Sequence, residues 1–236
     1  MTNTNFEQGK YQGQKGTLAS IALEANLPNT SVLKPSEHKY RKHNILFHDG
    51  DEAKYIYEVI SGTIKTTKML IDGRQQIIGF FGSGDVIGMP FNASVACTAE
   101  AVTDACVLCY PIVQVEKQMA CSATFSKTML KLVHTELIER MDHMVSLGRK
   151  RPAERVASFL LKCQSKPPVG IPNNRYVELP MSRTDIADYL GLTQETVCRI
   201  LSQFRRTGLI NATHSHEVKI QSLSSLEAMA EISAVH

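Results

Sequence analysis

Residues 180–210, PMSRTDIADYLGLTQETVCRILSQFRRTGLI, decide the fold of the C-terminal part of this chain. They predict two short amphipathic helices separated by a turn at Gly191, a residue free to adopt positive φ. Ser182 stands three residues before Asp185, the spacing of a capping box, and Thr193 is the expected cap of the second helix. The expected buried faces are Ile186, Ala187 and Leu190 in the first helix and Val197, Ile200, Leu201 and Phe204 in the second. Two helices joined by such a turn form a helix-turn-helix unit.

The polar face of the second helix carries residue types that read base edges in the major groove of DNA. Arg199 can donate two hydrogen bonds to guanine, and Glu195, one turn earlier, can accept from cytosine. Gln194 and Cys198 complete this base-reading set. The alternative is a plain surface ion pair between Glu195 and Arg199. Contacts to phosphates are expected from Arg183, Thr193, Arg205, Arg206 and Lys219.

Residues 36–122 have the texture of an all-β roll. Short runs of β-branched and aromatic residues are separated by glycines at intervals of 11 or 12 residues, at Gly50, Gly62, Gly73 and Gly84. The dipeptide Asp72-Gly73 predicts a type I′ hairpin, and strands are expected as far as Pro111. Such a roll can enclose a small ligand or be filled by its own side chains.

One long amphipathic helix is predicted next, because neither proline nor glycine interrupts residues 123–147. Its apolar stripe consists of Leu130, Val133, Leu137, Met141, Met144 and Gly148. The stripe can be buried against the chain's own roll or against a second copy of the helix. Gly148 is expected to end this helix, and Pro152 to open a shorter one over residues 153–163.

Composition sets limits on the function. With 26 Lys and Arg against 23 Asp and Glu, the formal charge is only +3, so attraction to nucleic acid must come from local clusters of charge. No window is apolar enough for a membrane helix, and the first 20 residues lack the pattern of a signal peptide, so a cytoplasmic protein without membrane contact is expected. Acidic residues are scattered without a matching nucleophile or base, which argues against an enzyme.

Three sequence segments resemble the CRP/FNR superfamily of bacterial transcription regulators. They are DIADYLGLTQETVCRIL at 185–201, AERVASFLL at 153–161 and GDVIG at 84–88. The resemblance covers about residues 38–222 and implies an α+β chain with four parts. These are a loose N-terminal arm at 1–35, a cyclic-nucleotide-binding-like β-roll at 36–122, a dimerisation helix at 123–148 and a winged-helix DNA-binding domain at 149–236, with residues 209–221 as the wing.

The resemblance also implies partners. It favours a homodimer joined through the apolar stripe, bound to double-stranded DNA. Glu195 and Arg199 match the base-reading Glu and Arg of the family, which implies a TTG-N8-CAA palindrome close to TTGAT-N4-ATCAA. Contact with RNA polymerase, as an activator, would use the loop at 164–174 and the hairpin at 71–75.

Two departures from the family pattern bear on the signal that the protein senses. Gly88 is followed by Met89-Pro90, and Cys97-Thr98 stand nearest to the position of the phosphate-binding Arg-Ser pair of cyclic-AMP-responsive members, so nucleotide binding in the usual mode is not expected. Residues 1–96 contain no cysteine for an iron–sulfur cluster. These two departures resemble the FixK-like branch, which acts in low-oxygen, respiratory or nitrogen-fixation control.

Neither a cofactor nor a metal is expected. Cys106 and Cys109 would face opposite sides of a strand, so these two thiols, with Cys97 and Cys121, are expected to be packed and reduced. The alternative is a ligand-gated regulator with haem or another small molecule in the roll; the available axial ligands are His38, His43, His48, His134 and His143.

Cys198 is a candidate redox switch. The helix dipole and the neighbouring Arg199 favour its thiolate, and oxidation would place a polar group against the DNA. The alternative is a small residue that contacts a thymine methyl group.

Overall fold

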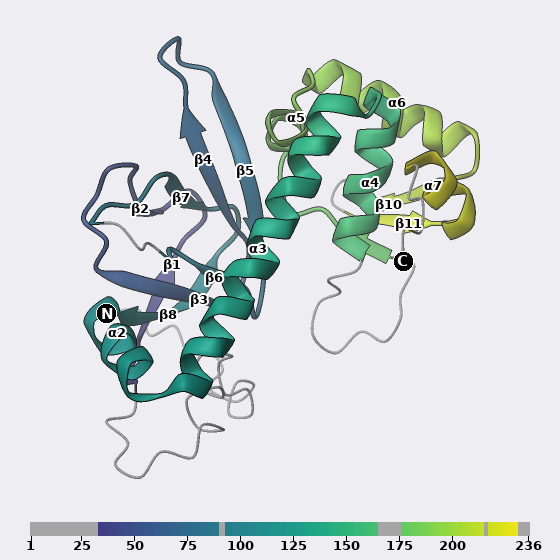
Figure 1. The fold of residues 1–236 in the computed structure, drawn as a ribbon. Helices are drawn as coiled ribbons and strands as arrows, with labels where there is room; N and C mark the ends of the chain where they lie inside the picture. Colours follow the sequence, from purple (N-terminus) through teal and green to yellow (C-terminus); the bar gives the residue numbers. More distant parts are fainter. Residues whose placement is uncertain (1–32, 90–92, 165–175, 215–216, 231–236) are drawn as a thin grey trace, which may run out of the picture.

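The computed structural model describes residues 33–89, 93–164, 176–214 and 217–230. Most of the arm predicted at 1–35 and nearly all of the loop at 164–174 lie outside the described residues. Figure 1 shows a β-roll, one long helix beside it and a smaller helical domain at the far end of that helix. The chain is therefore built from α and β parts in the predicted order.

Two four-stranded antiparallel sheets form the roll. The first contains, in spatial order, β1 (Ser36–Tyr40), β8 (Ala105–Pro111), β3 (Tyr55–Ser61) and β6 (Val86–Ile87). The second contains β2 (Ile45–Phe47), β7 (Thr98–Ala101), β4 (Ile64–Met69) and β5 (Gln75–Phe81). Apolar side chains from both sheets, among them Tyr57, Ile64 and Val107, form one buried cluster. Side chains therefore pack the interior of the roll.

The turns of the roll depend on glycine. Gly50, Gly62, Gly73 and Gly84 all have positive φ, between 83° and 90°. The β4–β5 turn is nevertheless not the predicted type I′. The Leu70 N–H donates to the Arg74 carbonyl over 2.7 Å, which closes a three-residue loop, and Gly73 has positive φ whereas Asp72 does not. A type I′ turn needs positive φ at both central residues, so that prediction was wrong.

Helix α3 (Ala123–Arg149) is the long helix predicted between the domains. It follows an unpredicted short helix, α2 (Ile112–Cys121), and its N-terminus is capped by Ser122, whose side chain accepts from the Phe125 N–H. The helix continues through Gly148, against prediction, and ends at Arg149. A glycine inside a helix costs only about 1 kcal/mol, whereas a proline disfavours helical backbone in the residue before it. Pro152, not Gly148, therefore marks the break.

The C-terminal domain packs helices on a small sheet. Its elements are α4 (Pro152–Gln164), β9 (Tyr176–Glu178), α5 (Arg183–Leu190), α6 (Gln194–Arg206), β10 (Ile210–His214), β11 (Glu217–Ile220) and α7 (Leu223–Ala230). The sheet has the order β10-β11-β9, so the predicted wing hairpin is present and gains an unpredicted third strand. Every residue predicted to be buried in α5 and α6 lies in one buried apolar cluster.

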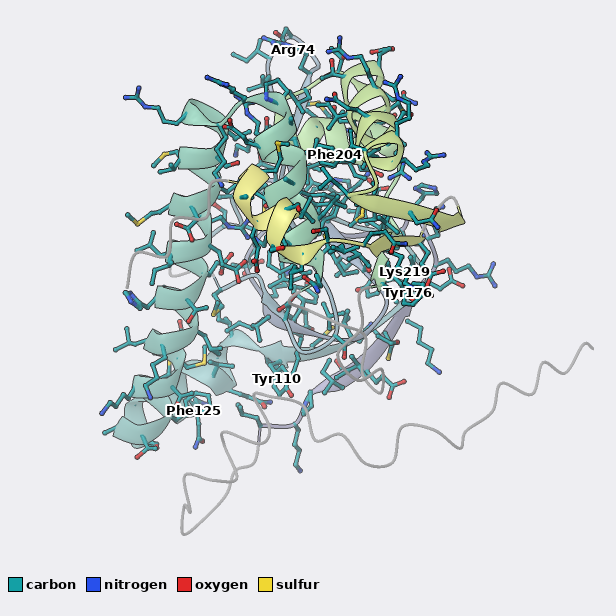
Figure 2. All side chains as sticks on the ribbon, turned by 90° about the vertical axis from the view of Figure 1, so that its right-hand side faces the viewer. Arg74, Tyr110, Phe125, Tyr176, Phe204 and Lys219 are labelled. Atoms are coloured by element: carbon teal, nitrogen blue, oxygen red, sulfur yellow. The ribbon has the colours of Figure 1, made fainter. Side chains whose placement is uncertain are left out.

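Helix α3 has one covered face and one exposed face. Phe125 and Met129 are buried against the roll. On the other side, Leu130, Leu137, Met141 and Met144 are each more than half exposed, and Ile138 and Val145 extend this surface. Figure 2 shows the helix along one side of the molecule, where no other helix or strand of the described residues lies outside it. Among the predicted stripe residues only Val133 is half-buried, so the stripe is not covered by the described part of the chain's own roll.

Candidate nucleic-acid interface

Helix α5 begins with a complete capping box. The Asp185 N–H donates to the Ser182 Oγ over 2.9 Å, and the Ser182 N–H donates to the Asp185 Oδ2 over 3.0 Å. Aspartate thus fulfils the role that glutamate or glutamine usually has at this position. Gly191, with φ of 62°, ends the helix in the left-handed conformation. The turn of the helix-turn-helix is therefore formed as the sequence predicted.

Helix α6 presents the predicted base-reading set to solvent. Its first turn is capped by Thr193, whose Oγ1 accepts from the Thr196 N–H over 3.2 Å. Gln194, Glu195, Cys198 and Arg199 are all exposed, whereas Val197, Ile200, Leu201 and Phe204 are buried. The helix is thus anchored by one face, and its four polar residues lie together on the other.

Glu195 is ionised at neutral pH. Hydrogen bonds from its own backbone N–H and from the Thr193 hydroxyl hold the pKa of Glu195 below its usual value. An ionised carboxylate only accepts hydrogen bonds, as contact with a cytosine amino group requires. Among the ion pairs of the described residues, none joins Glu195 to Arg199, which leaves both charges available to a ligand.

The residues expected to contact phosphates differ in exposure and in the element that carries them. Arg205 and Arg206 are exposed in the last turn of α6. Arg183 is half-buried at the start of α5. Burial lowers the pKa of Arg183; the neighbouring Cys198 opposes this shift, and the charge of Arg205 adds to it. Lys219 lies apart on β11, with its Nζ 5.0 Å from the centre of the Tyr176 ring (Figure 2).

Of the four cysteines predicted to be packed, Cys109 is buried and Cys97 and Cys106 are half-buried. Cys121, the last residue of α2, is exposed, so the prediction was wrong there. Burial raises the pKa of Cys106 and of Cys109 to about 11 in each case. Cys109 lies in the core of the roll, whereas Cys198 is exposed on α6. In the described ranges, no group of three or more His, Cys, Asp or Glu side chains could hold a metal ion.

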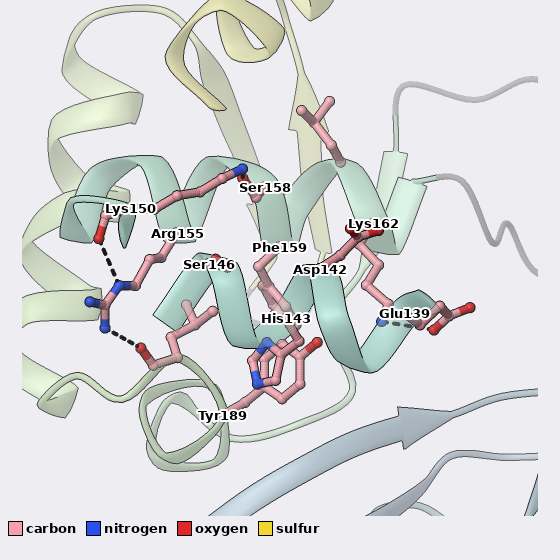
Figure 3. Close-up of a pocket in the computed structure, with 12 residues that line it drawn as sticks. Glu139, Asp142, His143, Ser146, Lys150, Arg155, Ser158, Phe159, Lys162 and Tyr189 are labelled. Carbon is pink, nitrogen blue, oxygen red and sulfur yellow. Dashed lines mark hydrogen bonds and ion pairs between the residues drawn. The ribbon is translucent and has the colours of Figure 1, made fainter. Parts of the chain in front are cut away.

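A cavity of about 440 Å³ lies between α3, α4 and α5 (Figure 3). His143 of α3 stacks on the ring of Tyr189 at its floor, and Lys162 forms an ion pair with Glu139 over 2.9 Å. Burial lowers the pKa of His143 to about 4, helped by the charges of Lys162 and Arg140. His143, one of the possible haem ligands, is thus a neutral ring packed between the long helix and the helix-turn-helix.

Comparison with known proteins places these features in a family. The Crp-like helix-turn-helix domain family matches residues 154–229, and the cyclic nucleotide-binding domain family matches residues 37–120. Over 185 residues the chain is 34% identical to the nitrogen fixation regulation protein FixK of Bradyrhizobium diazoefficiens, covering 78% of each chain. The chain belongs to the CRP/FNR family.

Other CRP/FNR proteins show the same relationship. The fumarate and nitrate reduction regulatory protein of Salmonella typhi is 30% identical over 192 residues, which cover 80% of this chain and 76% of that protein. The solved structure of FixK2 from Bradyrhizobium japonicum superposes with a TM-score of 0.80 at 35% identity, covering 84% of this chain and 98% of FixK2. This CRP/FNR protein is accordingly a FixK-like transcription regulator with a DNA-binding helix-turn-helix. Within the described residues, no helix is both long and apolar enough to span a bilayer.

Three polar residues of the roll contact the helix-turn-helix. Lys65 and Gln76 were not singled out from the sequence, and Gln75 only as the end of the hairpin expected to contact RNA polymerase. Lys65 Nζ lies 2.8 Å from Asp185 Oδ1. The amides of Gln75 and Gln76 donate to the side chain and to the carbonyl of Asp188, each over 2.7 Å. These contacts join residues more than 100 positions apart, and no local pattern predicts such pairs.

Proposed function

We propose that this protein is a homodimeric, sequence-specific transcription activator that reads a TTG-N8-CAA palindrome without a small-molecule effector. The observation that carries the proposal is the capped helix α6, which exposes Gln194, Glu195, Cys198 and Arg199 together. Relatives named as nitrogen fixation regulators support a role in low-oxygen, respiratory or nitrogen-fixation control. The proposed domains are a β-roll at 36–122, a dimerisation helix at 123–148 and a DNA-binding domain at 149–236.

Base reading is assigned to two side chains. Arg199 would donate to O6 and N7 of guanine, and Glu195 would accept from N4 of cytosine. Gln194 is held at the start of α6 by Thr184, whose hydroxyl donates to the Gln194 Oε1 over 3.1 Å. It therefore lies beside the base-reading pair, where it can contact an adjacent base. Arg183, Thr193, Arg205, Arg206 and Lys219 are assigned to phosphates, which fix the register on the duplex.

The dimer is assigned to the exposed face of α3. Leu130, Leu137, Met141 and Met144 form an apolar surface on a 27-residue helix, opposite the face that packs on the roll. Pairing with a second copy would bury this surface and place two α6 helices on one face of the dimer. The two-fold symmetry of such a dimer implies a palindromic site, and helix-turn-helix dimers bind half-sites about one DNA turn apart.

Two further sites belong to the proposal. RNA polymerase would contact the β4–β5 hairpin tip, where Ile71 is fully exposed beside the Arg74–Asp72 ion pair, and the loop at 164–174, which lies outside the described residues. Cys198 would act as a redox switch, because its exposed thiol lies beside Arg199 and within the electrostatic reach of Arg183. Peroxide would oxidise this thiol to a sulfenic acid and be reduced to water, and the added oxygen would disturb the base-reading surface.

The test is binding of the reduced protein, at fixed salt and without nucleotide, to a TTGAT-N4-ATCAA duplex. The control is the same duplex with each G·C pair of the half-sites replaced. We expect tight binding that is lost on the substituted duplex. Peroxide should weaken binding of the wild type but not of Cys198→Ala. Equal binding to both duplexes, or binding only after a small molecule is added, would overturn the proposal.

A further inference from the structure

The roll and the helix-turn-helix meet at a buried cation. Lys65 points from β4 toward α5, and its side chain is only 10% exposed. Its Nζ lies 2.8 Å from the Asp185 Oδ1 and 3.3 Å from the Glu100 Oε2. One ammonium group thus joins two carboxylates, one from the roll and one from the first helix of the DNA-binding motif.

This group is charged despite its burial. Burial alone would lower the pKa of Lys65, but the hydrogen bond and charge of Asp185, with a contribution from Glu100, outweigh it and raise the pKa. Burial alone would likewise raise the pKa of Asp185, yet hydrogen bonds from Lys65 and Ser182 hold it below its usual value. Removal of the lysine would leave two carboxylates without their shared cation in a poorly solvated place.

Asp185 uses its two oxygens for different purposes. Oδ2 accepts from the backbone N–H and the hydroxyl of Ser182, which starts α5, whereas Oδ1 accepts from Lys65. The contact therefore holds α5 by its first turn. Gln75 and Gln76 of β5 hold its last turn through Asp188, and Gln76 also donates to the Tyr189 carbonyl over 3.2 Å.

The same two strands are also tied to the long helix α3. The β4–β5 ladder has a bulge at Ile78, which lies between the cross-strand pairs Thr66–Gly79 and Thr67–Ile77 and is itself not paired with a residue of β4. The Ile78 carbonyl accepts from the Arg140 guanidinium of α3, and a side chain on Gly79 would come within 2.6 Å of that guanidinium. Strands β4 and β5 therefore connect the proposed dimer helix to the helix-turn-helix.

From this arrangement we infer that Lys65 is a positioning residue for DNA recognition. Its ion pair with Asp185 holds the helix-turn-helix against the roll of the same protomer and thereby sets the separation of the two α6 helices in the dimer. The inference rests on the proposed function, because it assumes two half-sites read at once. The base-reading residues lie on α6 and do not touch Lys65, so its effect is on geometry and not on recognition of a single half-site.

The test compares half-site spacings. Lys65→Met removes the charge but keeps much of the apolar stem, and Lys65→Arg restores the cation. Lys68→Met is the matched control, because Lys68 lies on the same strand, is 47% exposed and pairs with Asp49. Each variant is titrated with duplexes that carry TTG and CAA separated by seven, eight or nine base pairs, and with a duplex that carries one half-site.

For Lys65→Met we expect the affinity for the eight-base-pair spacing to fall about tenfold, within the usual range of coupling between sites. The preference for eight over seven or nine base pairs should shrink, single half-site binding should stay unchanged, and Lys65→Arg should recover most of the preference. Lys68→Met should behave as the wild type.

The inference is overturned if Lys65→Met keeps the spacing preference of the wild type, or if it loses affinity equally on every duplex, half-site included. Wild-type protein that binds none of the duplexes would instead refute the proposed function. Circular dichroism and the solution mass check that each variant is folded. If Lys65→Met does not fold, Lys65→Gln replaces it, because the amide removes the charge but leaves a polar donor beside Asp185, and the same two results decide the question.

Discussion

His143 of α3 stacks face to face on Tyr189 of α5, with ring centroids 4.0 Å apart and planes inclined by 9°. The His143 ring of the long helix therefore forms part of the contact between α3 and the helix-turn-helix. Because burial, Lys162 and Arg140 lower the pKa of His143 to about 4, this contact forms with the neutral ring.

The first prediction is a loss of stability in mild acid. The unfolded chain takes up a proton at His143 near its ordinary pKa of 6.5, whereas the folded chain resists protonation down to about 4. The unfolded state binds more protons in that interval, so the free energy of unfolding should fall as the pH drops from 6.5 toward 4. Between pH 7 and pH 5 the share of His143 should be about 1–2 kcal/mol, measured by urea unfolding. His143→Phe keeps a ring that can stack on Tyr189, but its free energy of unfolding should no longer contain this pH-dependent contribution. His38→Phe, at an exposed position, should retain the contribution of His143.

The second prediction separates base reading from phosphate contact. Arg199→Ala should cost about 1–3 kcal/mol for each half-site of the cognate duplex and relax the preference for the G·C pair. Arg206→Ala should weaken binding to all duplexes alike and, because each subunit of the dimer loses one contact, reduce the dependence of log K on log salt by about two units. Titrations at three salt concentrations on cognate and substituted duplexes measure both effects. An Arg206→Ala variant with altered base preference would contradict the assignment.

A third prediction concerns the exposed face of α3. Met141→Glu places a charge in the middle of the apolar surface, so sedimentation at micromolar concentration should show a monomer with weakened binding to the palindrome. Thr124→Glu, exposed on the same helix but outside that surface, should remain a dimer. A dimeric Met141→Glu protein would show that the subunits associate elsewhere.

The fourth prediction uses two turn glycines with nearly equal φ, 85° at Gly62 and 83° at Gly73. A side chain on Gly73 meets nothing within 4 Å, so Gly73→Ala should cost only backbone strain, about 1–2 kcal/mol. A side chain on Gly62 would overlap the Asp104 carbonyl and come within 2.7 Å of the Ala105 Cα. Gly62→Ala should therefore cost about 1–3 kcal/mol more than Gly73→Ala in urea unfolding, because the backbone around it must shift. Equal losses in the free energy of unfolding would show that the backbone at Asp104 and Ala105 shifts without cost.

Local signals were enough to predict most of the candidate site. The cap at Thr193, the turn at Gly191 and the spacing of apolar residues fix α5 and α6, and with them the exposed face that holds Glu195 and Arg199. The long helix followed from its apolar periodicity, and the roll from the regular spacing of glycines between β-branched and aromatic runs.

What the sequence did not predict depends on distant partners or on backbone detail. Strand β9 exists because it pairs with β11. The loop at Gly73 has three residues instead of the two of a type I′ turn, and Asp72 lacks the positive φ that such a turn needs. The contact between Lys65 and Asp185 joins positions 120 residues apart, which only the assembled fold brings together.

The capping box of α5 also explains a choice of amino acid. Glutamate or glutamine is the common residue at this position, because the longer side chain reaches back easily to the cap. Here the carboxylate must meet Ser182 and Lys65 at once, and the aspartate does so with one oxygen for each. An extra methylene would still permit helix initiation but would displace the oxygen that Lys65 requires. Position 185 is thus constrained more tightly than helix formation demands. Substitutions that are harmless in an isolated DNA-binding domain should destabilise a chain that also contains the roll.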